Sequence, residues 1–135
     1  MNANKNTKII YPELSYKITG ILFKVHNELG NRYHEKYYQR AVENEPRANN
    51  IKFAKELSVD LTYNGEKIGK YRLDFFIDDK IILEIKTVPR LNPTDFKQVT
   101  AYLRSKNIKL GILANFRTEK LTSKRILNSQ VNYSD

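Results

Sequence analysis

The alternation of apolar and polar residues in the middle of the chain constrains its fold more than any other feature. Every second residue between positions 57 and 63 is apolar, namely Leu57, Val59, Leu61 and Tyr63. This pattern is typical of a strand with one buried face, and the Asn64-Gly65 that follows is favoured in two-residue hairpin turns. We expect a partner strand over residues 68–76, a turn at 78–80 and a third strand over 81–87. The sequence therefore predicts an antiparallel meander of three strands.

The segment before the meander has the period of helices. Apolar residues recur three or four positions apart over residues 14–29, and Gly30 is a typical stop signal after such a stretch. A second helix is expected to begin near His34. Pro46 should end or kink this helix at about Glu45, because an interior proline lacks an N–H group and clashes with the preceding turn.

The segment after the meander returns to a helical pattern. Asn92 and Pro93 are typical of an N-cap and a first helical residue. A short apolar strand is expected over residues 109–114, and a last short helix over 121–127. Because a helical crossover allows the third and fourth strands to pair in parallel, the order α-α-β-β-β-α-β predicts an α/β fold. Its α-β-β-β-α-β core would surround a mixed central sheet flanked by helices.

The length of 135 residues is typical of one domain. We place this domain at residues 11–127, between a flexible N-terminal arm over 1–10 and a C-terminal tail over 128–135. Apolar residues make up 40% of the chain, which excludes a disordered tail, and no apolar run approaches the roughly 20 residues of a membrane span. The polar start does not resemble a secretory signal, and the absence of cysteine excludes disulfides and thiolate metal sites. We therefore expect a cytoplasmic protein with no membrane partner.

The charge balance is strongly positive. Lys and Arg number 24 against 15 Asp and Glu, which gives a net charge of +9. Such a surplus favours a polyanionic partner, most often nucleic acid, because neutralising phosphates is the main source of non-specific affinity. A solvated lysine-rich surface that serves only solubility would give the same balance, so the charge alone leaves both interpretations open.

Three charged residues mark the place where the second and third expected strands meet. Side chains two apart on a strand share a face, so Glu84 and Lys86 point the same way, and pairing across the 78–80 turn brings Asp74 close to them. Adjacent carboxylates repel unless a cation lies between them, and oxygen ligands suit Mg²⁺ or Mn²⁺. Glu-x-Lys is also common on solvated strand faces. The apolar third strand is expected to be covered on both faces, however, where unpaired charges are costly.

The spacing of these residues resembles the signature of a known enzyme group. Asp74, followed after nine residues by Glu84-x-Lys86, is similar to the core motif of the PD-(D/E)XK nuclease superfamily, which has a restriction-endonuclease-like fold. Gln98 and Tyr102, four residues apart on the following helix, resemble the Gln-x-x-x-Tyr motif of the RecB-like branch.

The amino-terminal part of the chain resembles the small bacterial GxxExxY proteins of that superfamily. The similar residues are Val25-His26, Leu29-Gly30, Glu35-x-x-Tyr38, Tyr71-Arg72-x-Asp74 and Asn115-Phe116. The glycine that gives this group its name falls on Arg32, so the turn before Glu35 must be built differently.

The resemblance implies a role for each residue of the core motif. Asp74 and Glu84 would hold the metal together with the backbone carbonyl of Ile85, and Lys86 would position the attacking water. Glu35 would add a ligand directly or through water, although an ordinary exposed carboxylate at a helix start is the simpler interpretation of it.

The resemblance or the sequence also points to four further residues. Gln98 would orient the site or a substrate group, and Tyr102 would contact a phosphate or stack on a base, unless it only packs in the core. His26 is a lower-ranked metal candidate, since a hydrogen-bonded packing residue is the commoner role for such a histidine. Arg72 would hold a phosphate or a carboxylate.

The function implied by the resemblance is that of a metal-dependent nuclease that cuts DNA with Mg²⁺ or Mn²⁺. One alternative is a nucleic-acid-binding module of the same fold with little or no turnover. Another is a structure-specific, junction-type endonuclease. A homodimer is compatible with each of these, because small domains often dimerise to cover a sheet edge.

Overall fold

Three helices and five strands lie within residues 9–129, the part of the chain that this computed structural model describes. The expected arm over residues 1–10 and tail over 128–135 fall mostly outside it. The elements, in chain order, are α1 (Pro12–Leu29), α2 (Glu35–Ala48), β1 (Phe53–Tyr63), β2 (Glu66–Ile77), β3 (Ile81–Lys86), α3 (Pro93–Lys106), β4 (Leu110–Asn115) and β5 (Thr122–Leu127).

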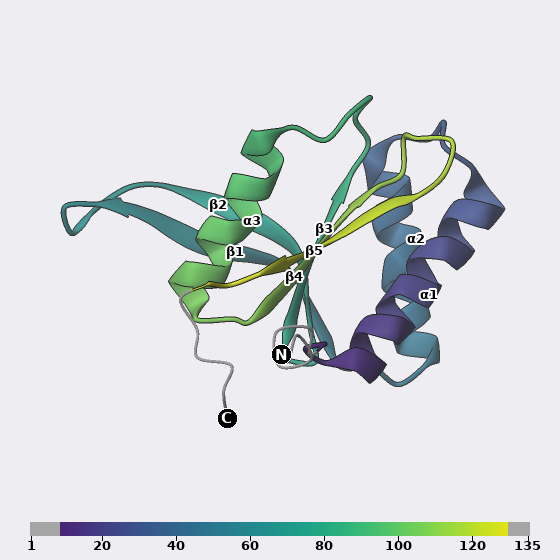
Figure 1. Cartoon of the computed structure of the whole chain (residues 1–135), viewed down its shortest axis with the longest axis horizontal. Coiled ribbons are helices and arrows are strands. Elements are labelled where there is room, and N and C mark those ends of the chain that lie inside the picture. The colour runs from purple at the N-terminus through teal and green to yellow at the C-terminus, as the bar shows by residue number, and fades with distance from the viewer. Residues whose placement is uncertain (1–8, 130–135) are drawn as a thin grey trace, which may run out of the picture.

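The strands form one mixed sheet in the order β1-β2-β3-β4-β5 (Figure 1). β3 and β4 pair in parallel, with α3 as the crossover between them, and the other neighbours pair antiparallel. The predicted meander, the parallel pair and the mixed α/β sheet are therefore confirmed.

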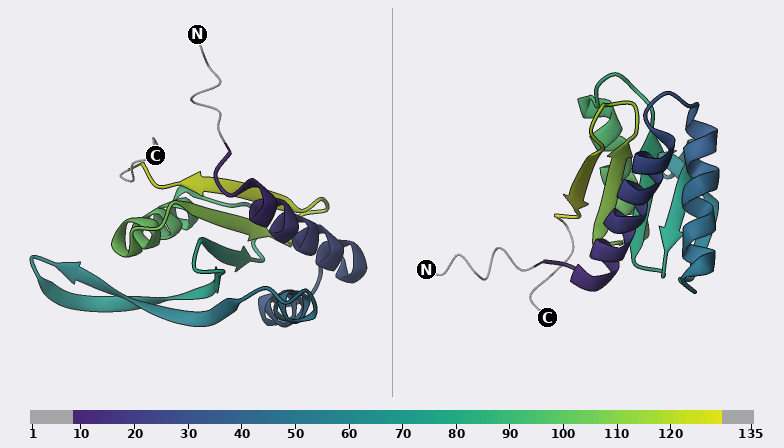
Figure 2. Two further views of the ribbon diagram at one scale, coloured as in Figure 1. Left: turned by 90° about the horizontal axis from the view of Figure 1, so that it is seen from below. Right: turned by 90° about the vertical axis from the view of Figure 1, so that its right-hand side faces the viewer.

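Helices cover both faces of this sheet (Figure 2). α1 and α2 pack on one face through a cluster that includes Leu22, Tyr38 and Leu83, while α3 packs on the other through a cluster that includes Ile82 and Leu103. Ile82 and Leu83 are neighbours on β3, so alternation places the two clusters on opposite faces. Among the described helices, none is long and apolar enough to cross a membrane.

α2 continues through Pro46, contrary to the expectation that the helix would end or kink at Glu45. Pro46 lies buried in the last turn, and the helix ends at Ala48. The missing proline amide removes one hydrogen bond near the helix end, which is too late to break the helix. The amide of Asn49 then donates to the carbonyls of Glu45 and Pro46 and closes the turn.

Residues 122–127 form strand β5, so the expected short helix over 121–127 is wrong. β5 pairs antiparallel with β4 along its whole length. A segment this short cannot be assigned from its period alone, and a helix of that length would be marginal on its own. The free edge of β4 provides the hydrogen bonds that decide the outcome.

The β1–β2 hairpin changes sides of the sheet at Asp74. Leu73 packs in the cluster with α3, whereas Phe75 packs in the cluster with α1 and α2. Strict alternation would place both on one face. Glu56 lies opposite Asp74 between the pairs 55/75 and 57/73, and its φ of 55° is left-handed, which is uncommon in a strand residue other than glycine. The backbone of Glu56 therefore turns where the hairpin crosses the sheet.

Candidate active site

The site lies where strands β2 and β3 separate. Their backbone ladder runs from Ile77 opposite Ile81 to Phe75 opposite Leu83, and beyond this point β2 pairs only with β1. Figure 1 shows the β1–β2 hairpin extending away from the rest of the sheet from here. The next residues along the two strands carry the carboxylates of the predicted site.

At this position side-chain carboxylates, instead of backbone carbonyls, accept the hydrogen bonds between β2 and β3. The backbone amide of Asp74 donates to Oε1 of Glu84 at 2.7 Å. The backbone amide of Ile85 donates to Oδ2 of Asp74, also at 2.7 Å. The structure thus brings Asp74, Glu84 and Ile85 together and fixes the direction of both carboxylates.

The burial of these carboxylates changes their acidity. Burial raises the pKa of Asp74 to about 6 and the pKa of Glu84 to about 8. Repulsion from the Asp74 charge further raises the pKa of Glu84, and repulsion from Glu35 raises that of Asp74. The backbone hydrogen bonds and the positive charge of Lys86 lower both pKa values but do not outweigh the desolvation.

α2 brings a third carboxylate to the same place. Glu35, at the first position of α2, is half-buried, and its pKa is raised mainly by burial, against the lowering effects of the Lys86 charge and a hydrogen bond from the backbone of Thr87. One turn later, Nε2 of Gln39 donates to Oδ1 of Asp74 at 2.9 Å and to Oε2 of Glu35 at 3.2 Å. A neutral amide therefore bridges two carboxylates that would otherwise repel each other.

The start of α2 is held by the other residues of the amino-terminal motif. The hydroxyl of Tyr38 donates to the carbonyl of Gly30 at 2.7 Å, and its ring stacks on Phe116 at 4.6 Å between centroids. Gly30 has a φ of 78°, a conformation that glycine adopts without strain, and it ends α1 there. These contacts position Glu35 although Arg32 stands where the resembled group has its glycine.

Lys86 is the cation nearest these carboxylates. It lowers the pKa of Glu35, Asp74 and Glu84, and its Nζ lies 4.0 Å from Oδ1 of Asp95. Asp95 is held in turn by a capping box with Asn92 at the start of α3. Because a buried carboxylate limits where the ammonium group can go, Lys86 stays on the side of the cluster that faces α3.

The donor set fits a hard divalent cation. Within residues 9–129, no group of three or more His, Cys, Asp or Glu side chains is arranged to hold a metal ion, so a cation here would depend on two carboxylates and water. The donors that meet are carboxylate oxygens, and Mg²⁺ binds through one or two of these while keeping several waters. Zinc favours His and Cys ligands, which are absent from this group. Asp74 and Glu84 are therefore suited to Mg²⁺ or Mn²⁺.

Two predicted residues have packing roles in the structure. Tyr102 is only 2% exposed, its hydroxyl donates to the carbonyl of Arg72 at 2.7 Å, and these contacts favour the packing role over contact with a phosphate. His26 is buried against Phe116, with Nε2 3.0 Å from the carbonyl oxygen of Thr118, which is likewise a packing arrangement.

Arg72 and Gln98 lie closer to solvent. Nη2 of Arg72 lies 3.0 Å from Oε2 of Glu56, so the guanidinium holds a carboxylate of the hairpin. Gln98 is half-buried on α3, and its side chain makes no hydrogen bond within residues 9–129.

Three residues of the site were not predicted from the sequence. Gln39 had an available signal, because it lies four residues after Glu35 and so shares its helix face. Asp95 had no signal for a role in the site, because its contact with Lys86 depends on how α3 packs. Glu56, which raises the pKa of Asp74, had no signal in the sequence.

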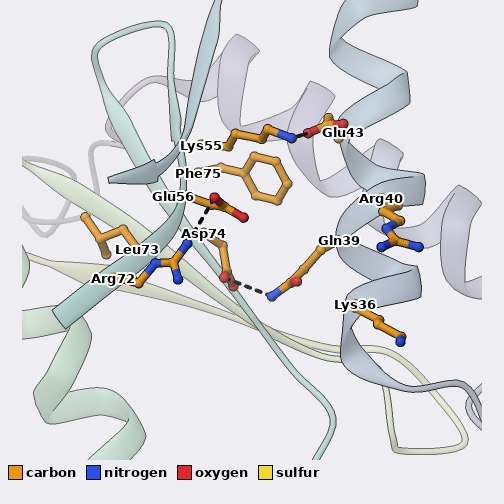
Figure 3. A pocket seen from close by; sticks show the side chains of 10 residues that line it. All are labelled: Lys36, Gln39, Arg40, Glu43, Lys55, Glu56, Arg72, Leu73, Asp74 and Phe75. Atoms are coloured by element: carbon orange, nitrogen blue, oxygen red, sulfur yellow. Dashed lines mark hydrogen bonds and ion pairs between the residues drawn. The ribbon is translucent and has the colours of Figure 1, made fainter. Parts of the chain in front are cut away.

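A cavity opens beside Asp74 between α2 and the β1–β2 hairpin (Figure 3). Its volume is about 480 Å³. The charged residues that line it are Lys36, Arg40, Glu43, Lys55, Glu56, Arg72 and Asp74. Four of these are cations, so the cavity leads from a positively charged rim to the carboxylate cluster.

Comparison with known proteins identifies the fold. A model of the PD-(D/E)XK nuclease superfamily matches residues 12–126. The crystal structure of SSO0001 is similar, with a TM-score of 0.54 and 21% sequence identity over 70% of this chain and 50% of that one. This chain therefore spans about half the length of SSO0001, and the likeness concerns the fold alone. No curated protein matches the sequence.

Proposed function

Because the chain belongs to the PD-(D/E)XK nuclease superfamily, we propose that it is a metal-dependent nuclease that hydrolyses phosphodiester bonds in DNA. The observation that carries this proposal is the meeting of Asp74, Glu84 and Lys86 at the end of the β2–β3 ladder. Three carboxylates and one lysine at a half-buried point are costly to maintain for stability alone. Their arrangement is explained if they serve a reaction.

Asp74 and Glu84 would hold Mg²⁺ or Mn²⁺, with the carbonyl of Ile85 as a further ligand and Glu35 as a direct or water-linked one. Bound there, the cation would stabilise negative charge on the phosphate and acidify a water molecule. The two backbone hydrogen bonds to the carboxylates support this role, because they fix Oδ2 of Asp74 and Oε1 of Glu84. Oδ1 of Asp74 accepts from the neutral amide of Gln39, which a cation would displace.

Lys86 would position the attacking water. Its ammonium group donates hydrogen bonds only, so it can orient a water oxygen and attract charge that develops on the phosphate. The contact with Asp95 limits its movement, and its side chain remains 23% exposed, which leaves one side open to substrate. In this proposal Gln39 keeps Asp74 and Glu35 apart at the correct spacing until a cation is bound.

The turn before α2 supports a finer assignment to the GxxExxY group of the RecB-like branch. Tyr38 ties this turn to α1 and so directs Glu35 toward Lys86. We also propose a cytoplasmic location. A homodimer is compatible with the free edge of β1.

A nucleic-acid-binding module with little turnover is the second candidate. The observation that favours it is the hydrogen bond from Gln39 to Asp74, which occupies an oxygen that a metal would use. The two candidates share the positive surface and differ in their need for metal.

The experiment that separates them is a cleavage assay on end-labelled single-stranded, double-stranded and branched DNA, with RNA as a control, in Mg²⁺, Mn²⁺ or EDTA. Products that form only with metal support the nuclease. Cutting confined to the branched substrate would indicate a junction-type enzyme. No products with any substrate, together with binding that survives EDTA, would support the binding module instead.

A further inference from the structure

Two exposed tyrosines stand at the start of α2, beside the cavity. Tyr33 is 51% exposed and Tyr37 is 42% exposed, and their ring centroids lie 6.2 Å apart in an edge-to-face arrangement. Tyr38, next along the chain, is fully buried and makes the packing contacts of this turn. The two exposed rings therefore present apolar surface to solvent while adding little to the core.

Two cations join these rings to the cavity. Nζ of Lys36 lies 5.2 Å from the ring centroid of Tyr37, and Cζ of Arg40 lies 5.9 Å from it. Lys36 and Arg40 also line the cavity that reaches Asp74 (Figure 3). Being four residues apart, they lie one helical turn from each other on the same face.

These two cations differ from the others around the cavity. Lys55 pairs with Glu43, and Arg72 pairs with Glu56. Neither Lys36 nor Arg40 forms an ion pair with any carboxylate in the described part of the chain. The charge of Arg40 lowers the pKa of Glu43 without forming an ion pair with it, and the charge of Lys36 is available to an anion from outside.

A second cavity continues the positive surface past the start of α2. Tyr33 lines it together with Arg32, Arg117 and Thr87. Thr87 directly follows Lys86, and its backbone hydrogen-bonds to Glu35. The carboxylate cluster thus lies between two cavities that carry cations. Tyr33 lies in the turn before α2, and Tyr37 lies in the first turn of the helix.

We propose that this α2 surface, formed by Tyr33, Lys36, Tyr37 and Arg40, binds single-stranded nucleic acid and leads an unpaired strand to Asp74. Aromatic rings stack on bases whose faces are free, and the bases of a duplex have no free faces within the stack. A cavity of about 480 Å³ is in the size range of small-ligand pockets, which suits one or two nucleotides of an unpaired strand. Combined rings and cations are the usual means of holding a single strand.

The proposal that this surface leads a substrate strand to Asp74 rests on the proposed nuclease activity. The proposal that it binds a single strand does not. The test is therefore a binding measurement in EDTA, by fluorescence anisotropy of a labelled oligodeoxythymidine of about 12 nucleotides, against a hairpin duplex of the same strand length. The variants are Tyr37→Ala, Tyr37→Phe and the double change Lys36→Gln with Arg40→Gln. Tyr16→Ala is the matched control, because Tyr16 is 81% exposed on α1.

The wild type should bind the single strand more tightly than the duplex. Tyr37→Ala should weaken single-strand binding about 5- to 150-fold, while Tyr37→Phe and Tyr16→Ala leave it unchanged. The double cation variant should lower the salt slope for the single strand by about 1.4, because each lost phosphate contact removes about 0.7.

Equal affinity of Tyr37→Ala and Tyr16→Ala for the single strand would overturn the inference. So would tighter binding of the duplex by the wild type. Circular dichroism of each variant checks that the fold is kept, and Tyr33→Ala replaces Tyr37→Ala if that protein is unfolded. Predicted binding with no cleavage would contradict the nuclease proposal alone, whereas cleavage without these binding effects would contradict this inference alone.

Discussion

The backbone amide of Asp74 donates a hydrogen bond to the carboxylate of Glu84 at 2.7 Å, where the β2–β3 ladder would otherwise continue. The carboxylate of Asp74 accepts from the amide of Ile85 in the same way. The two acids thus satisfy the amides that the separating strands leave unpaired. The two carboxylates therefore belong both to the candidate site and to the hydrogen bonding of the sheet, so replacing either one affects both.

The metal-free protein should lose stability as the pH rises through the acidity range of these carboxylates. The pKa of Asp74 rises from 3.8 to about 6 and that of Glu84 from 4.5 to about 8 on folding. Between the unfolded pKa and the folded pKa of each group, the folded state binds more protons than the unfolded state. The free energy of unfolding therefore falls with increasing pH in this range. Urea unfolding in EDTA from about pH 5 to about pH 8.5 measures this.

Other groups also titrate in this range, so the comparison is with Glu84→Gln, which keeps a hydrogen-bond acceptor and removes the charge. The stability of the wild type relative to Glu84→Gln should fall steadily toward high pH. A difference that is constant with pH would mean that Glu84 has an ordinary pKa and is not desolvated.

Mg²⁺ should raise the melting temperature of the wild type and not that of Glu84→Gln. Binding to the folded state stabilises it in proportion to the logarithm of metal concentration over Kd, about 2.7 kcal/mol at 100 times Kd. Glu66→Gln, at the exposed start of β2, is the matched control and should respond like the wild type. Equal shifts in all three proteins would place the metal elsewhere.

Gln39→Met should destabilise the metal-free protein, because it removes the amide between Asp74 and Glu35 but keeps a side chain of similar size. Two acceptors lose a donor, and the expected cost is about 1–3 kcal/mol at neutral pH. The loss should shrink in saturating Mg²⁺, since a cation between the carboxylates replaces the amide. Chemical unfolding with and without Mg²⁺ measures both values, and the same loss in both conditions would show that Gln39 does not act through the carboxylates.

Tyr102→Phe should lower stability by about 0.5–1.5 kcal/mol, because the hydroxyl of the buried Tyr102 donates to the carbonyl of Arg72. Urea unfolding measures the change. An affinity for nucleic acid that fell while stability stayed constant would instead support the contact with a phosphate that the sequence suggested.

Elements whose signals are local could be predicted from the sequence. Asn92 as the N-cap and Pro93 as the first helical residue placed the start of α3 correctly, and the pairing across the 78–80 turn placed Asp74 beside Glu84. The expected strand over 57–63 is part of a longer strand, β1, that begins at Phe53. Its first residues lack the alternation, so only pairing with β2 defines them.

The position of Glu56 shows why part of the site could not be predicted. The Asn64-Gly65 turn pairs Tyr63 with Glu66 and Thr62 with Lys67, a register that would place Lys55 opposite Asp74. An irregularity after Thr62 shifts the pairing by one residue, so that Glu56 takes this place. Nothing local in the sequence marks such a bulge, and a shift by one residue changes which side chain meets the site.

Tertiary contacts also determine the secondary structure of segments whose sequence pattern fits both a helix and a strand. Residues 121–127 have too few apolar positions to separate helix from strand, and the free edge of β4 makes them a strand. Pro46 is compatible with α2 only because it lies in the last, buried turn. In both cases a tertiary contact outweighs a local preference.

The measurement that tests the account most directly is the rate of DNA cleavage in Mg²⁺ by Lys86→Ala beside the wild type. Lys80→Ala, in the exposed turn between β2 and β3, is the matched control. The account predicts cutting by the wild type and by Lys80→Ala, and a rate at least about 100-fold lower for Lys86→Ala with its fold and its affinity for DNA unchanged. Cleavage by Lys86→Ala at the wild-type rate would contradict the account.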